Sequence, residues 1–103
     1  MKIIKILFDD ILVDQSECAQ IISNACKRGN WTVSGICELS GAVAVVLLPG
    51  KDDNTKGVVF AKFAEDDNDG KVAEIHDHYR GGHDLVGTFY IDDQLWGLFK
   101  KRN

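Results

Sequence analysis

The stretch DQSECAQIISNACKRG, residues 14–29, carries the signals that begin, support and end an α-helix. Asp14 stands at the N-cap position and Glu17 follows three residues later, which is the spacing of a capping box. Gly29 supplies the residue type that most readily takes the left-handed conformation beyond a helix end. The apolar residues between these ends recur at the spacing of one helical face: Cys18, Ala19, Ile21, Ile22, Ala25 and Cys26. We therefore predict an amphipathic helix.

The segments around this helix carry the patterns of β-strands. Residues 2–8 form a short apolar run, and residues 31–39 alternate with the period of a half-buried strand. Residues 42–48 are apolar without interruption and predict a strand covered on both faces. A Pro-Gly pair ends this strand, and residues 51–56 predict a polar loop.

The second half of the chain predicts further strands at residues 57–65, 85–91 and 95–99. The stretch between the first two of these, residues 71–80, is ambiguous because its apolar residues fit both the helical and the strand period. The acidic loop at residues 66–70 has the length and the final glycine of a hairpin turn. We therefore predict that residues 71–80 form a strand paired with residues 57–65, and a helix remains the alternative.

These elements predict a single α+β domain over residues 1–103, in the order β-α-β-β-β-β-β-β. One amphipathic helix packs on a mostly antiparallel sheet, and no internal repeat is evident. A helix of about fifteen residues is roughly 22 Å long and about 10 Å across, whereas six strands span roughly 29 Å. We therefore expect the sheet either to be strongly curved or to bury its spare face against another molecule.

The spare face of the sheet is predicted to carry large apolar side chains near the C-terminal end of the sequence. Tyr90, Trp96 and Leu98 fall on it together, and aromatic residues are enriched in protein interfaces. We therefore predict a small, non-catalytic protein-interaction or regulatory module that acts through this uncovered face. Its expected partner is a second copy of the chain, giving a homodimer, or another protein.

All three histidines lie in one short segment, as His76, His78 and His83. On the predicted strand, His76 and His78 project from the same face, and His83 can reach them across the glycine turn that follows. Imidazole ligands at this spacing suit zinc or a similar divalent metal. The alternative function is therefore a metal-binding or small-ligand-binding domain centred on these histidines, with enzymatic activity left open.

Catalysis has little support elsewhere in the sequence. No serine or cysteine stands in a recognisable nucleophile setting, and neither glycine motif of phosphate binding occurs. We therefore favour a protein without enzymatic activity and, apart from the metal alternative, without a cofactor.

Composition limits the partners and the compartment. The net charge is −4, from 16 acidic and 12 basic residues, which argues against a nucleic-acid partner because backbone phosphates require clustered Lys and Arg. Residues 1–10 are too short and too charged for a signal peptide or a membrane span, so no membrane association is expected. Three cysteines cannot form a complete disulfide set, and we expect all of them to be buried in a cytoplasmic protein.

Overall fold

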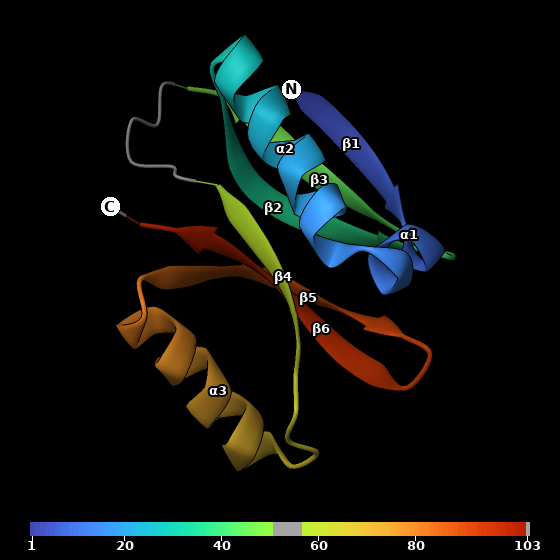
Figure 1. Ribbon diagram of the computed structural model, residues 1–103, viewed down its shortest axis with the longest axis vertical. Helices are drawn as coiled ribbons and strands as arrows, with labels where there is room; N and C mark the ends of the chain where they lie inside the picture. The colour runs from blue at the N-terminus through green and yellow to red at the C-terminus, as the bar shows by residue number, and fades with distance from the viewer. Residues whose placement is uncertain (51–56, 103) are drawn as a thin grey trace.

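The computed structural model describes residues 1–50 and 57–102, and the predicted polar loop at residues 51–56 lies outside this description. The described residues form six strands and three helices (Figure 1). The strands are β1 (Lys2–Leu7), β2 (Trp31–Leu39), β3 (Ala42–Pro49), β4 (Val58–Lys62), β5 (His83–Ile91) and β6 (Gln94–Lys101). The helices are α1 (Phe8–Val13), α2 (Gln15–Gly29) and α3 (Asn68–Arg80). The predicted α+β class is confirmed.

Helix α2 lies where its sequence signals predict. The Asp14 side chain accepts a hydrogen bond from the Glu17 main-chain nitrogen at 3.1 Å, which satisfies one of the donors exposed at a helix N-terminus. At the other end, Asn30 rather than Gly29 takes the left-handed conformation, with φ 54° and ψ 50°. The buried face of the helix consists of Cys18, Ala19, Ile22 and Cys26.

The prediction of a strand over residues 71–80 is wrong, because these residues belong to α3. The acidic loop before them acts as a helix start, since the Asp67 side chain accepts a hydrogen bond from the Gly70 nitrogen at 3.3 Å. The Glu74 carboxylate then ties the helix to the preceding segment by accepting hydrogen bonds from the Ala64 and Glu65 nitrogens at 2.8 and 2.9 Å. Both contacts favour the helix over a hairpin.

The strands form two antiparallel, three-stranded sheets instead of one. The N-terminal sheet has the order β1-β3-β2 and the C-terminal sheet has the order β4-β6-β5. The two sheets meet where β2 lies beside β5. There the Glu38 carboxylate accepts a hydrogen bond from the Tyr90 main-chain nitrogen at 2.6 Å.

The two sheets repeat one β-α-β-β unit, which corrects our expectation that the chain contains no repeat. The pairing of β2 with β3 shifts register between Val33 and Gly35, and the pairing of β5 with β6 shifts between Leu85 and Gly87. Equivalent residues of the two irregularities are separated by the same 52 positions that separate Glu38 from Tyr90. A shared bulge at the same point of the unit indicates that the two halves have one architecture.

The hydrogen bonds that close each unit repeat at the same spacing. The Gly50 nitrogen donates to the Asn30 carbonyl at 3.0 Å, and the Arg102 nitrogen donates to the Gly82 carbonyl at 2.7 Å. Asn30 and Gly82 both have a positive φ, 54° and 92°, and lie one and two residues after the ends of their helices. The unit is therefore duplicated in its turns as well as in its strands.

The main core lies around α2 and draws on both units. Ile22 of α2, Val45 of β3 and Leu98 of β6 are all fully buried in it. Phe89 of β5 also lies in this core, where it stacks on the Phe8 ring at 5.8 Å. The C-terminal sheet thus folds back over the helix of the first unit, and β4 runs beside α2 (Figure 1).

Candidate interaction surface

The structure buries two of the three residues predicted to form an interface. Trp96 is 2% exposed and Leu98 is fully buried, whereas Tyr90 is 49% exposed. The expectation that Trp96 and Leu98 lie on an open sheet face is wrong, because that face of the C-terminal sheet packs against the core around α2. The uncovered apolar surface lies instead on the N-terminal sheet.

The N-terminal sheet has one packed face and one open face. Along β3, Val43, Val45 and Leu47 are fully buried in the main core. Successive side chains of a strand alternate between faces, so the residues between these point to the opposite side. The strand register brings their neighbours on β1 and β2 to the same side. We call this surface the open face and define it by Ile3, Leu7, Leu39, Ala42, Ala44, Val46 and Leu48.

The open face has large aliphatic side chains at its margin and small ones at its centre. Ile3 is 54% exposed, Leu7 47%, Leu39 42% and Leu48 41%. Ala42 lies between Leu7 and Leu39, Ala44 lies between Lys5 and Cys37, and both alanines are buried. The exposed aliphatic side chains of this surface therefore come from all three strands of the N-terminal sheet.

Two chemically distinct side chains interrupt this apolar surface. Lys5 on β1 and Cys37 on β2 both pair with Ala44, from opposite sides of β3. Both side chains therefore point to the open face. Both side chains are exposed. Lys5 places a positive charge on β1, the outer strand of the open face. The prediction that all cysteines are buried is therefore confirmed for Cys18 and Cys26 and is wrong for Cys37.

No helix of the described residues packs on the open face. Helix α2 lies on the other side of the N-terminal sheet, and α3 packs against β5 at the opposite end of the long axis of the molecule (Figure 1). The prediction that residues 42–48 are covered on both faces is therefore wrong for one face. That prediction rested on the uninterrupted run of apolar residues, which does not reveal how many layers surround a strand.

The outer edge of β1 adjoins the open face and is also unpaired within the described chain. The corresponding edge of β4 is covered by α2, where the Val58 nitrogen donates to the Ser23 hydroxyl at 3.3 Å. The outer edges of β2 and β5 lie against each other. Unpaired strand edges and apolar sheet faces are both surfaces on which other chains dock.

The three histidines do not converge on one point. His76 and His78 lie on α3, where a separation of two residues turns side chains by roughly 200° instead of aligning them. His78 stacks on the buried Phe99 ring with 4.0 Å between ring centroids. The centroid of the His83 ring lies 6.1 Å from that of His78. Within residues 1–50 and 57–102, no group of three His, Cys, Asp or Glu side chains is placed to hold a metal ion. The geometric premise of the metal alternative, a strand over residues 71–80, is therefore wrong.

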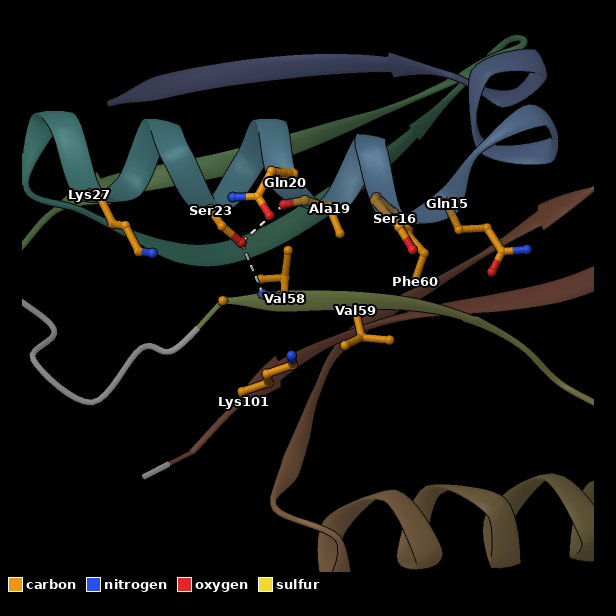
Figure 2. A pocket seen from close by; sticks show the side chains of 11 residues that line it. Gln15, Ser16, Ala19, Gln20, Ser23, Lys27, Val58, Val59, Phe60 and Lys101 are labelled. Atoms are coloured by element: carbon orange, nitrogen blue, oxygen red, sulfur yellow. Dashed lines mark hydrogen bonds between the residues drawn. The ribbon is translucent and has the colours of Figure 1, made fainter.

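A cleft of about 350 Å³ separates α2 from β4 (Figure 2). The Ser23 hydroxyl bridges its walls, since it accepts from the Val58 nitrogen and donates to the Ala19 carbonyl at 3.0 Å. Lys27 lies towards one end of the cleft, beyond Ser23, and Lys101 lies below Val58 in the same view (Figure 2). Its described lining includes no carboxylate, imidazole or thiol. The cleft therefore offers hydrogen-bonding groups and positive charge.

The open face is the surface that the geometry supports best as a functional site.

Among the described residues, no helix combines the length and the apolar composition needed to cross a membrane. Comparison of the chain with protein families, with curated proteins and with solved structures finds no match.

Proposed function

We propose that this protein is a small, non-catalytic protein-interaction module whose working surface is the open face of the N-terminal sheet. The observation that carries the proposal is the group of four aliphatic side chains, each 41–54% exposed, on one uncovered sheet. Complete burial of a large aliphatic side chain contributes roughly 1.5–3 kcal/mol, so covering the exposed halves of four contributes about 3–6 kcal/mol. Exposed groups of large apolar side chains on a sheet face mark binding surfaces in soluble proteins.

The state of the cysteines supports a cytoplasmic location for this module. Cys18, Cys26 and Cys37 are not joined to one another by a disulfide, and Cys37 is exposed on the open face. Free thiols persist in reducing compartments, whereas oxidising compartments favour disulfides. An exposed thiol on a binding surface is compatible with a reducing cytoplasm.

Cys37 also provides the test, because it places a natural attachment point within the open face. A photoreactive maleimide on Cys37 should cross-link to whatever occupies this face in cells that make the protein. The cross-link should be lost in Ile3→Glu, which puts a carboxylate on the face, and retained in Val72→Glu. Val72 is a matched control because it is 52% exposed on α3, away from the open face.

The outcome of the cross-linking experiment supports or overturns the proposed interaction module. A cross-link that maps to the open face and depends on Ile3 supports the proposal, whether the captured chain is a second copy or another protein. A face that forms no Ile3-dependent cross-link in cells overturns it.

A further inference from the structure

A groove runs beside the outer edge of β1, between this strand and α2, and we call it the edge groove. It consists of two adjoining cavities of about 470 and 320 Å³, and Ile4 of β1 and Ile21 of α2 line both of them. Ile21 is 49% exposed, although the adjacent Ile22 is fully buried. On its other side α2 packs against β4 (Figure 1). One flank of α2 is therefore closed by a strand, and the flank beside β1 is open.

The main chain of β1 presents hydrogen-bonding groups along this edge. The Phe8 nitrogen donates to the Gly41 carbonyl at 3.0 Å, which makes these two residues a hydrogen-bonded pair of the β1–β3 ladder. Such pairs recur at every second position of an antiparallel ladder, so the main-chain groups of Ile4 point towards β3. Those of Ile3 and Lys5 point to the outer edge, where no strand of the described chain pairs with them. An added strand would find both donors and acceptors there.

Opposite charges lie at the two ends of the edge groove. Lys2 and Arg28 line the cavity at the end where β1 begins. Three carboxylates line the cavity at the end where β1 leads into α1: Asp10, Asp14 and Glu17. That cavity also borders Lys5, whose side chain points to the open face. Within residues 1–50 and 57–102, none of these charged side chains forms an ion pair. The edge groove therefore favours a strand with a basic beginning and an acidic end.

We infer that a second copy of this chain adds its own β1 to this edge, antiparallel to the first, so that the two N-terminal sheets join into one. Antiparallel pairing brings the beginning of one β1 to the end of the other. The basic end of each edge groove then lies against the acidic end of the other, and a two-fold axis makes this contact twice. The chain thus supplies the charge order that its own groove favours. The contact uses the sheet edge and not the open face, so it does not depend on the proposed function.

The side chains of β1 select the register of this pairing. Ile3 of each copy lies opposite Lys5 of the other, and each such pair exchanges both of its main-chain hydrogen bonds. Ile4 then meets its own equivalent on the two-fold axis, and the Ile21 side chains of both copies lie beside it in the middle of the groove. A register two residues further along would place Lys5 opposite Lys5, and like charges directly opposite each other destabilise a strand pair.

Two charge-reversal variants test this pairing by sedimentation of the full chain over a wide concentration range. Lys2→Glu with Arg28→Glu makes both ends of the edge groove acidic, and Asp10→Lys with Glu17→Lys makes both ends predominantly basic. The mass of the parent chain should approach twice that of the monomer as concentration rises, whereas each variant alone should remain monomeric. An equimolar mixture of the two variants should recover the dimer, because each end then meets the opposite charge.

The dimer should also depend on the main chain of β1. Ile3→Pro removes an N–H that points to the outer edge and leaves the β1–β3 hydrogen bonds in place. It should keep the parent chain monomeric and abolish the recovery when introduced into one variant of the mixture. Leu39→Glu is the matched control, because it places a charge on the open face and should dimerise like the parent chain. Circular dichroism should show the same fold in all variants.

Every other outcome of the sedimentation experiment counts against the edge pairing. A parent chain that stays monomeric overturns the inference, and so does a mixture of the two charge variants that fails to associate. Association that survives Ile3→Pro, or that is lost in Leu39→Glu, places the dimer on another surface and also overturns it. If Ile3→Pro fails to fold, the mixture of charge variants decides alone. The cross-linking of Cys37 tests the open face separately.

Discussion

The Glu38 carboxylate accepts a hydrogen bond at 2.6 Å from the main-chain nitrogen of Tyr90, the residue that occupies the same position in the second unit. This contact joins the outer strands of the two sheets, which share no main-chain ladder in the described structure. The carboxylate is a strong acceptor, but the hydrogen bond is exposed to solvent, so water competes with it and reduces its net contribution. The duplicated unit therefore contacts itself through equivalent positions that hold different residues.

The approach of the two sheets predicts unequal losses of stability for alanine substitutions at two equivalent glycines. A Cβ on Gly87 would lie 2.7 Å from Cγ1 of Ile36, whereas a Cβ on Gly35 would meet nothing within 4 Å. Gly87→Ala should lower the free energy of unfolding by about 1–3 kcal/mol, the usual cost of overpacking. Gly35→Ala, its matched control, should change stability by less than about 1 kcal/mol. Urea denaturation measures both, and equal losses would show that β5 does not approach Ile36 as described.

Trp96 tests whether the C-terminal sheet folds back onto the core. Its indole nitrogen is buried without a hydrogen-bond partner among the described residues, a state that costs about 1–3 kcal/mol. Trp96→Ala should lower the free energy of unfolding by about 3–5 kcal/mol through the cavity it leaves. Trp96→Phe should cost much less, because it removes the unpaired donor and keeps most of the packing. Similar losses for the two variants in guanidinium denaturation would contradict a buried, unpaired indole.

The cysteines should separate into one fast and two slow thiols. Burial, followed by the nearby Asp10, Glu17 and Asp14 carboxylates, raises the pKa of Cys18 above its ordinary value. A raised pKa means less thiolate at a given pH, so Cys18 should react slowly with a thiol reagent in the native protein. Cys26 should also be slow because it is buried, and Cys37 should react fast. The fast phase should vanish in Cys37→Ser, and its persistence there would refute the assignment.

Zinc should leave the melting temperature unchanged at near-stoichiometric concentration. The placement of His76 and His78 on different sides of α3 removes the paired ligands that a site needs. A ligand present at about a hundred times its dissociation constant would instead stabilise the fold by ~2.7 kcal/mol. Thermal denaturation with and without zinc measures the difference. A rise that disappears in the His76→Ala, His78→Ala double variant would restore the metal alternative.

Local signals explain what the sequence could predict. The bounds of α2 follow from its cap, its apolar face and its stop, all of which lie within the helix and its flanking residues. Helix α3 lacks an equivalent apolar face, and part of its support comes from Glu74 holding the segment before the helix. Such a contact depends on how the chain folds back, so the ambiguous period of residues 71–80 could not reveal it.

The location of the uncovered face depended on contacts that the sequence does not display. Both faces of the strands carry apolar residues, and the direction in which the second sheet folds decides which face is buried. The repeat left one trace in the sequence, an Arg-Gly pair followed by a glycine at the bulge, at Arg28, Gly29 and Gly35 and again at Arg80, Gly81 and Gly87. The other residues diverge because equivalent positions face different neighbours.

Two units on one chain are free to differ where two identical subunits are not. In a symmetric assembly of a single β-α-β-β unit, the positions of Ile22 and Glu74 would hold the same residue. That residue would lie in the buried core in one place and at the exposed margin in the other. Covalent linkage removes that constraint, so the first helix can bury an apolar face while the second has no buried residue. As a consequence, the outer surface of the N-terminal sheet is not covered by any described helix of its own chain.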